Sequence, residues 1–152
     1  MGLFGSVETG IPVPDDRGVW LRDVLEPEVD PHYWVNDRLA KRITALVGAL
    51  PAGERVLFQR GRGFNKGGIH TEKAPTLSAH AWEQNHFIVG GGVVRRVTPT
   101  EAARLQTVPT WYQWGCSTTQ QYRLLGNGWT VEVIKHLLSF LDGYELSCQN
   151  EL

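Results

Sequence analysis

The chain has 152 residues and a formal net charge of −1, with 41% hydrophobic and 20% charged residues. This length allows one domain with a real core, or a small domain that carries an additional lobe. The charge balance excludes a nucleic-acid binder that is basic throughout, although it leaves room for a local basic patch.

The cysteines, histidines and apolar runs exclude several classes of protein. Cys116 and Cys148 form neither a CxxC pair nor a disulfide framework, a pattern that fits a reducing cytoplasm. The N-terminus lacks a signal-peptide pattern, and no apolar run approaches the roughly 18 residues of a membrane span. The five histidines have no metal-ligand spacing, and we therefore expect a cytoplasmic protein without a metal.

The first predicted element is an extended lead-in over residues 1–35, which are rich in Pro, Gly and Asp, with a short helix possible over Val19–Leu25. A helix follows, because apolar residues recur on one stripe after Asn36, a plausible N-cap. The stripe consists of Leu39, Ile43, Leu46, Val47 and Leu50. Arg55–Arg60 is predicted to be a strand.

Residues 55–71 form a basic, glycine-rich stretch without any acidic residue. This composition predicts a flexible loop, which is either a solvated surface or a contact to nucleic acid. Arginine can pair with guanine edges, and basic loops make phosphate contacts that weaken with salt. The candidate DNA-binding residues are Arg60, Arg62 and Lys66, with His70, Lys73, His80 and Gln84 as weaker candidates.

Three short strands are predicted next, at Pro75–Ala79, His86–Val89 and Val93–Val97, with a tight reversal at the glycines 90–92. The following helix runs to about Gln106. Thr98 and Glu101 at its start can form a capping box, and Arg104 lies on the face of Glu101.

The C-terminal part is predicted to be helical. After a loop over Thr107–Ser117, a helix covers Thr118–Leu125, with Thr118 as its cap and Gln121 three residues later. A last amphipathic helix covers Trp129–Leu141. The sum is an α+β fold, because the strands do not alternate with helices.

The predicted boundaries are therefore a lead-in over residues 1–35, a lobe of short strands over 36–97 and a helical segment over 98–145. Between the last two helices stands the sequence Gly126-Asn127-Gly128-Trp129. It is either a plain connection between helices, or a turn whose Asn amide and main-chain N–H groups bind a polar ligand.

Two segments resemble a known family. "RRVTPTEAARLQTVP" (95–109) and "QQYRLLGNGWTVEVIKHLL" (120–138) resemble motifs nine and ten, the last two motifs of DNA cytosine-5 methyltransferases, in order and separation. Residues 20–37 are similar to the start of the target-recognition region in phage-type and bacterial members, and residues 71–89 resemble its end.

The resemblance implies a target-recognition lobe that binds double-stranded DNA, and C-terminal helices that complete a Rossmann-like domain whose main half is absent. It implies that Gly126, Asn127, Gly128 and Trp129 form one wall of an S-adenosylmethionine pocket that is shared with a partner chain. It also implies a scaffold role for Arg96, Glu101 and Arg104, together with Arg95, in holding the lobe against the catalytic domain.

The catalytic elements of the family are not in this sequence. Cys116 follows Gly115 and Cys148 follows Ser147, so neither forms the Pro-Cys pair that supplies the nucleophile. The Glu-Asn-Val acid and the donor-binding glycine loop are also missing. The expectation is a part of a split enzyme that needs a catalytic partner carrying the Pro-Cys pair. The alternative is an inactive DNA-binding or regulatory module that docks on a methyltransferase.

Overall fold

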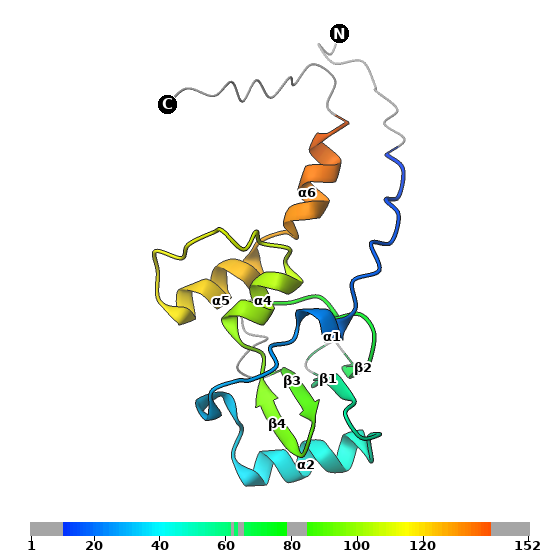
Figure 1. The fold of residues 1–152 in the computed structure, drawn as a ribbon, viewed down its shortest axis with the longest axis vertical. Helices are drawn as coiled ribbons and strands as arrows, with labels where there is room; N and C mark the ends of the chain where they lie inside the picture. Colours follow the sequence, from blue (N-terminus) through cyan, green and yellow to red (C-terminus); the bar gives the residue numbers. More distant parts are fainter. Residues whose placement is uncertain (1–10, 62, 64–65, 79–84, 141–152) are drawn as a thin grey trace.

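The computed structural model describes residues 11–61, 63, 66–78 and 85–140. Figure 1 shows a small sheet in the middle of the molecule, with one helix below it and others above it. The last helix and the segment that begins at residue 11 extend away from the sheet toward the same end of the molecule. The mixture of helices with a small antiparallel sheet agrees with the α+β class expected from the sequence.

The four strands form an antiparallel sheet in the order β2-β1-β3-β4. The central strands are β1 (Arg55–Gln59) and β3 (His86–Gly90), and the edges are β2 (Gly68–His70) and β4 (Val93–Arg96). Apolar residues are consecutive in β1 and β3 because both faces of the sheet are covered, and alternate side chains point to opposite faces.

One face of the sheet packs on α2 (Asp37–Val47), where Ile43 is buried against Val56 and Val89. The other face packs on three helices, α1 (Leu21–Val24), α4 (Pro99–Leu105) and α5 (Thr118–Asn127). There Leu57 and Ile88 belong to a core cluster that also contains Leu21, Val24, Leu25, Val97, Ala102, Ala103, Tyr122 and Leu125. The sheet and the helices α4 and α5 that carry the two motifs therefore share one core.

Local capping explains two of the helix starts. The Asn36 side chain accepts a hydrogen bond of 2.9 Å from the N–H of Leu39 and so begins α2. At the start of α4, Thr98 and Glu101 form the predicted capping box. Both caps were predicted correctly from the sequence.

The glycines of the β3–β4 turn are required by geometry. Gly91 and Gly92 have φ values of 61° and 77°, which favour residues without a Cβ. At Gly90, a Cβ would collide with the main-chain carbonyl of Glu54. The tight reversal predicted at this place is confirmed.

The strand predicted at Pro75–Ala79 is wrong, since residues 75–78 have no regular structure, and Ala79 lies outside the described residues. Pro75 has no N–H to donate to a ladder, and Leu77 contributes to the core as a single side chain. The additional strand is instead β2, inside the stretch that was expected to be a loop.

The helix bounds in the C-terminal part also differ from prediction. The N-cap of α5 is Ser117, paired with Gln120, one residue before the predicted pair. The helix continues through Gly126 and Asn127, since the N–H of Gly128 donates to the carbonyl of Leu124 at 2.8 Å. The last helix, α6, spans Val131–Leu138 and so begins two residues later than predicted.

The predicted lead-in contains more structure than its composition suggested. The short helix expected near residue 20 is present as α1, and a 3-10 turn follows at Pro31–Tyr33. Leu21 is only 2% exposed, and its N–H donates to the carbonyl of Glu72 at 2.6 Å. Leu21, Val24 and Leu25 are therefore part of the core rather than of a free arm.

Candidate functional site

The basic loop is the connection of a β-hairpin. Gln59 at the end of β1 pairs with Gly68 at the start of β2, so residues 60–67 form the loop between them. Arg60 and Lys66 stand at its two ends with exposed side chains. The N–H of Arg60 donates to the carbonyl of Asn85 at 2.7 Å, which fixes the base of the loop to the start of β3. Arg62 lies outside the described residues.

Gly67 allows this loop to close. Its φ of 73° favours glycine, and a Cβ there would collide with the carbonyl of Gln59 and the N–H of Gly61. The close approach of the two main chains at the loop base therefore depends on the absence of a side chain.

Two of the weaker DNA-binding candidates, His70 and Lys73, lie away from the ends of the loop. His70 is half-buried at the far end of β2, opposite Leu57. The Lys73 ammonium donates to Asp16 and to the carbonyl of Val19, both at 2.9 Å. His80 and Gln84 lie outside the described residues.

The contacts of Lys73 give it a structural part. Its Nζ atom also lies 5.0 Å from the centre of the Trp20 ring. The hydrogen bond from Lys73 lowers the pKa of the Asp16 carboxyl below its ordinary value, and the N–H of Gly18 adds to this effect. Lys73 therefore attaches the segment before α1 to the segment after β2.

Residues 126–130 line an open hollow of about 520 Å³. Gly126 and Asn127 belong to the last turn of α5, and Gly128 and Trp129 connect it to α6. Other lining residues are Ala74, Pro75, Thr76 and Leu77 from the segment after β2, Leu105 and Gln106 from the end of α4, and Val133 from α6. No role was predicted from the sequence for Thr76, Gln106 or Thr130.

The side chain of Asn127 is exposed at this hollow. Within the described ranges its amide makes no hydrogen bond, so its NH2 group and its carbonyl oxygen remain for a ligand. The hollow and the basic hairpin lie at the same end of the sheet. His86, which pairs with Gln59 beside the loop, lines a smaller cavity together with Gly126.

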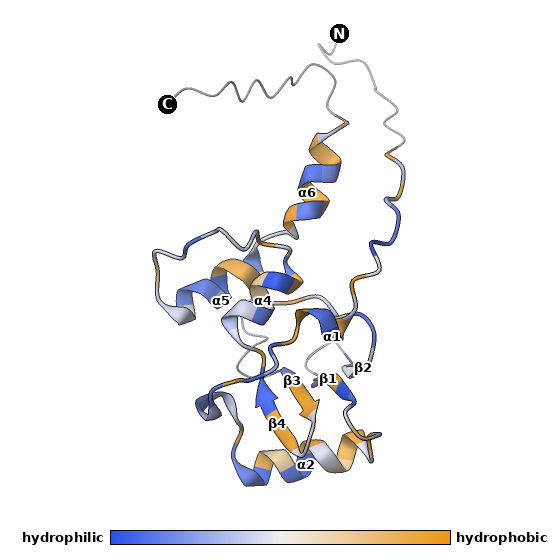
Figure 2. Ribbon diagram, viewed as in Figure 1, coloured by the Kyte–Doolittle hydropathy of each residue, from blue (hydrophilic) through white to orange (hydrophobic). Residues whose placement is uncertain are grey.

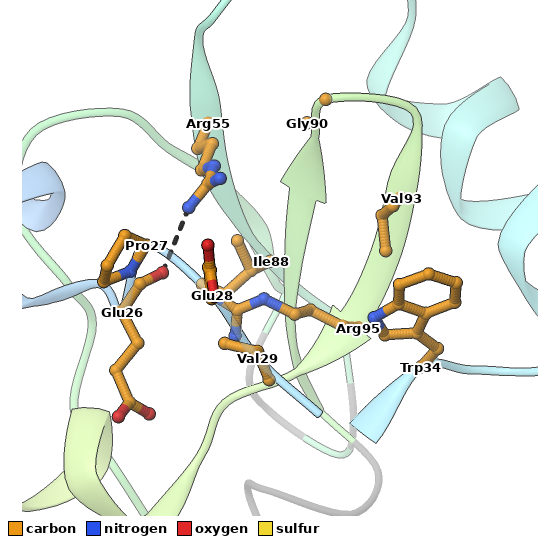
Figure 3. Close-up of a pocket in the computed structure, with 11 residues that line it drawn as sticks. Glu26, Pro27, Glu28, Val29, Trp34, Arg55, Ile88, Gly90, Val93 and Arg95 are labelled. Atoms are coloured by element: carbon orange, nitrogen blue, oxygen red, sulfur yellow. Dashed lines mark hydrogen bonds between the residues drawn. The ribbon is translucent and has the colours of Figure 1, made fainter. Parts of the chain in front are cut away.

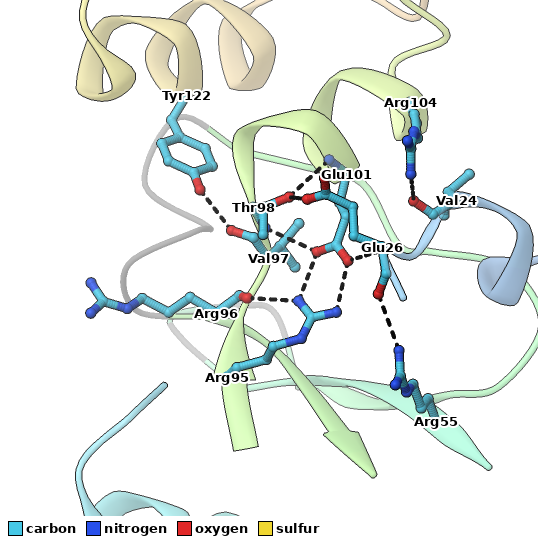
Figure 4. Close-up of polar contacts among 10 residues, drawn as sticks. All are labelled: Val24, Glu26, Arg55, Arg95, Arg96, Val97, Thr98, Glu101, Arg104 and Tyr122. Carbon is cyan, nitrogen blue, oxygen red and sulfur yellow. Dashed lines mark hydrogen bonds and ion pairs between the residues drawn. The ribbon is translucent and has the colours of Figure 1, made fainter. Parts of the chain in front are cut away.

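Two of the predicted scaffold residues, Arg95 and Glu101, form a buried polar network with Thr98 and Glu26 (Figure 4). Glu101 is 0% exposed, and its carboxylate accepts two hydrogen bonds from the Arg95 guanidinium, at 2.7 and 2.8 Å. The N–H groups of Glu26 and Thr98 also donate to it, at 2.8 and 3.0 Å. Thr98 Oγ1 donates to the side chain of Glu26.

Arg104 does not pair with Glu101, although the two residues are three positions apart in α4. Its guanidinium donates to the carbonyl of Val24 at 3.0 Å, because Glu101 points into the core and is occupied by Arg95. Arg96 donates to the carbonyl of His32 at 3.3 Å. Arg95 thus connects β4 to α4, and Arg104 connects α4 to α1. Arg96 connects β4 to the 3-10 turn at Pro31–Tyr33.

A second hollow, of about 280 Å³, lies at the opposite end of the sheet beside the β3–β4 turn (Figure 3). Trp34, Glu28 and two arginines line it. The arginines are already engaged, since Arg95 holds Glu101 and Arg55 donates to the carbonyl of Glu26 at 3.2 Å. This hollow is distant from both the hairpin loop and the turn at residues 126–130.

An apolar groove of about 670 Å³ runs beside α6. Trp111 and Trp129 in its walls are 78% and 69% exposed, and Tyr112 packs edge-on against Trp114. The helix α6 has no buried residue, although hydrophobic residues recur along it (Figure 2). Its contacts to the lead-in are polar: His136 meets the carbonyl of Pro12 at 2.8 Å, and Arg17 pairs with Glu132 at 3.2 Å.

Two further classes of site are not found in the part of the chain that the structure describes. No group of three or more His, Cys, Asp or Glu residues there could hold a metal ion. No helix in those ranges has the length and apolar character needed to cross a bilayer.

Comparisons with known proteins point to one family. The sequence model of the C-5 cytosine-specific DNA methylase family matches residues 41–141. The chain is 31% identical over 138 residues to the Type II methyltransferase M.NlaX of Neisseria lactamica, covering 88% of the chain and 42% of that protein. It is 31% identical over 141 residues to M.SsoII of Shigella sonnei, with 86% and 35% covered.

A third relative matches over a shorter part of the chain. Over 76 residues the chain is 36% identical to the Type II methyltransferase M.AluI of Cellulosimicrobium cellulans, covering 49% of the chain and 14% of that protein. The chain therefore spans about two-fifths or less of the length of the curated relatives that it matches.

Proposed function

Because the chain belongs to the C-5 cytosine-specific DNA methylase family, we propose that it is the DNA-recognition part of a DNA (cytosine-5)-methyltransferase. It also completes the methyl-donor pocket, and it acts only with a catalytic half on another chain. The observation that carries this proposal is the position of the basic hairpin and the turn at 126–130 at one end of the sheet. In this proposal, the hairpin that binds DNA and the turn that binds the methyl donor face a common cleft.

The hairpin loop is the proposed DNA contact. Arg60 and Lys66 are exposed at its ends, and its glycines allow a main chain to approach the duplex closely. Arginine suits guanine O6 and N7 in the major groove, while lysine suits phosphates. Arg62 shares this role in the proposal, whereas the contacts of Lys73 favour a structural part.

The hollow beside α5 is the proposed donor site, and its residues fit one side of S-adenosylmethionine. The free amide of Asn127 can donate to and accept from a polar group, and Gly126 and Gly128 leave room beside it. Trp129 offers an aromatic face at the rim. The donor supplies the methyl group, and the residues of this chain bind and orient it.

This chain supplies no nucleophile for the proposed reaction. Cys116 follows Gly115, and Cys148 lies outside the described residues. A cysteine of the catalytic half would add to C6 of a cytosine that has been flipped out of the duplex. This chain would hold the duplex in register through its hairpin while that chemistry proceeds.

The apolar groove and α6 are the proposed docking face for the catalytic half. Exposed Trp111, Trp129 and Leu124 form an apolar surface of the kind that marks a protein interface. In this proposal, α6 joins the partner to complete a Rossmann-like domain, and the network around Glu101 holds the recognition lobe in place relative to it.

The decisive experiment measures transfer of a tritiated methyl group from S-adenosylmethionine to duplex DNA. This chain, a catalytic half that carries a Pro-Cys pair, and their mixture are assayed side by side. We expect transfer only from the mixture, and we expect Asn127→Ala to raise the KM for the donor. Transfer by this chain alone would refute the proposal. An inactive mixture in which the chain still binds DNA would indicate a regulatory module.

A further inference from the structure

Gln106, at the end of α4, contacts both sides of the turn at 126–130. Its Nε2 donates to the carbonyl of Leu125 at 2.7 Å, and its Oε1 accepts from Thr130 Oγ1 at 2.9 Å. Its main-chain carbonyl accepts from the N–H of Val131 at 3.0 Å. Gln106 is 8% exposed. One buried residue therefore holds Leu125 before the turn, Thr130 at its end and Val131 after it.

Thr107 holds Glu132, the second residue of α6, and its own backbone is strained. Its φ is 55°, and it is the one residue other than glycine with a positive φ among the described residues. A β-branched side chain is unfavourable in that conformation, and such strain persists where function or the surrounding structure requires it. The Thr107 hydroxyl accepts from the N–H of Glu132 at 3.0 Å.

The two residues together replace the cap that α6 lacks. Thr130, the N-cap residue, makes no side-chain cap hydrogen bond of its own. The first N–H groups of α6, those of Val131 and Glu132, are taken by Gln106 and Thr107. A helix normally satisfies such groups from its own N-cap. Here the cap comes from the end of another helix.

Gly126 and Asn127 are held by α5, whereas Trp129, Thr130 and the start of α6 have few other contacts that could fix them. Asn127, Gly128 and Trp129 are exposed, and no residue of α6 is buried. The polar contacts of α6 to Pro12 and Arg17 involve exposed side chains, and such contacts are weak. The orientation of the second half of the turn and of α6 relative to the sheet therefore depends mainly on Gln106 and Thr107.

We propose that Gln106 and Thr107 are positioning residues for the methyl donor. They hold the turn at 126–130 and the start of α6 in the orientation that forms the donor wall. This inference rests on the proposed function of that turn. Neither residue has to touch the donor, because each acts through the main chain that it holds. A binding wall needs such support, since small displacements of a site lower affinity.

Substitutions at Thr107 separate the hydroxyl from the backbone strain. Thr107→Ser keeps the hydroxyl, Thr107→Val keeps the shape without it, and Thr107→Gly relieves the strain but also removes the hydroxyl. At the neighbouring position, Gln106→Glu keeps an acceptor for Thr130 but places a carboxylate oxygen against the carbonyl of Leu125. Gln113→Glu, at an exposed position of the following loop, is the matched control.

Two measurements test the proposal. The first is amide hydrogen exchange at Val131 and Glu132 in this chain alone, with thermal melting to verify the fold. The second is the KM for S-adenosylmethionine, the KM for DNA and kcat in the mixture with the catalytic half. For Thr107→Val, Thr107→Gly and Gln106→Glu we expect faster exchange and a KM for the donor raised about tenfold, the size of one lost hydrogen bond. The KM for DNA should stay within about twofold.

The outcomes are distinct. Thr107→Ser and Gln113→Glu should match the unmodified chain. A Thr107→Gly variant with unchanged donor KM would show that the hydroxyl is not needed and would overturn the proposal. An unchanged rate of amide hydrogen exchange at Glu132 in Thr107→Val would also overturn the proposal. This measurement needs only this chain and no catalytic half. A mixture of unmodified chains that transfers no methyl group would instead contradict the proposed function and leave the exchange result standing.

Discussion

Arg95 on β4 and Glu101 on α4 form a bidentate ion pair in which the carboxylate is fully buried, with N–O distances of 2.7 and 2.8 Å. The same carboxylate accepts the N–H of Glu26, which follows α1. A charge in this position is tolerated only when it is paired and hydrogen-bonded. The pair therefore fixes the sheet, α1 and α4 to one another at one point.

Removing the charge of Glu101 should destabilise the protein strongly. Glu101→Gln keeps the shape but leaves the Arg95 guanidinium buried without a counter-charge. Breaking such a pair from one side costs about 3–5 kcal/mol. Urea unfolding followed by circular dichroism measures the change. Glu28→Gln, at an exposed position, is the control and should stay within about 0.5 kcal/mol. Equal stability of the two variants would show that the pair is not what holds α4 in place.

Tyr122 should give the protein a stability that falls at alkaline pH. Its O–H donates to the carbonyl of Val97 at 2.7 Å, and burial raises the pKa of Tyr122 above its ordinary value of 10.0. The unfolded chain loses this proton near pH 10 while the folded chain keeps it, so the contribution is complete below pH 10 and declines above it.

Tyr122→Phe should therefore lower the free energy of unfolding at pH 7 by about 1 kcal/mol, the typical value of one hydrogen bond. It should also flatten the decline between about pH 9.5 and pH 11 in urea unfolding curves. Tyr112→Phe, at an exposed position, should leave the stability at pH 7 unchanged. A decline of the same steepness in Tyr122→Phe would assign the alkaline effect to other groups.

The elements that could be predicted from the sequence are those with local causes. The α2 and α4 starts follow from Asn36 and from the Thr98–Glu101 capping box, and β1 and β3 from short apolar runs. The strand β2 was missed because its three residues carry no pattern of their own. It exists because β1 pairs with it, and pairing between strands is not visible in a single segment.

The same distinction applies to the candidate site. The exposed position of Arg60 and Lys66 follows from a basic, glycine-rich loop, which is a local property. The ion pair of Lys73 could not be predicted, because its partner Asp16 lies 57 residues earlier in the chain. Gln106 and Thr107 were missed because their partners Leu125 and Glu132 follow 19 and 25 residues later.

Gly67→Ala should damage the hairpin loop more than a comparable change elsewhere. A Cβ at Gly67 would meet the main chain of Gln59 and Gly61, in addition to the unfavourable φ of 73°. Gly53→Ala is a matched control, since Gly53 has a φ of 81° with open space around it. The control should cost about 1 kcal/mol from φ alone, and Gly67→Ala should cost more. Urea unfolding compares the two, and equal costs would mean that the loop base can move apart.

Arg60 and Lys66 should account for part of the salt dependence of DNA binding. Each phosphate contact contributes about 0.9 to the slope of log K against log salt. If both residues contact phosphates, Arg60→Ala with Lys66→Ala should reduce that slope by about 1.8. Fluorescence anisotropy with a labelled duplex measures it. Arg38→Ala with Lys41→Ala, on the exposed side of α2, is the control of equal charge. An equal loss in both double variants would indicate a general charge effect rather than a hairpin contact.

Trp111 should contribute strongly to assembly with the catalytic half. It is 78% exposed at the apolar groove, and buried tryptophans frequently dominate the affinity of an interface. Trp111→Ser should weaken assembly by about 2 kcal/mol or more, which is at least roughly thirtyfold in Kd. Leu46→Ser is the control, because Leu46 is 65% exposed on α2, outside the groove. Titration calorimetry with the catalytic half measures both. If Leu46→Ser weakened assembly as much as Trp111→Ser, the docking face would have to include α2. The groove beside α6 would then not be the main site of contact with the catalytic half.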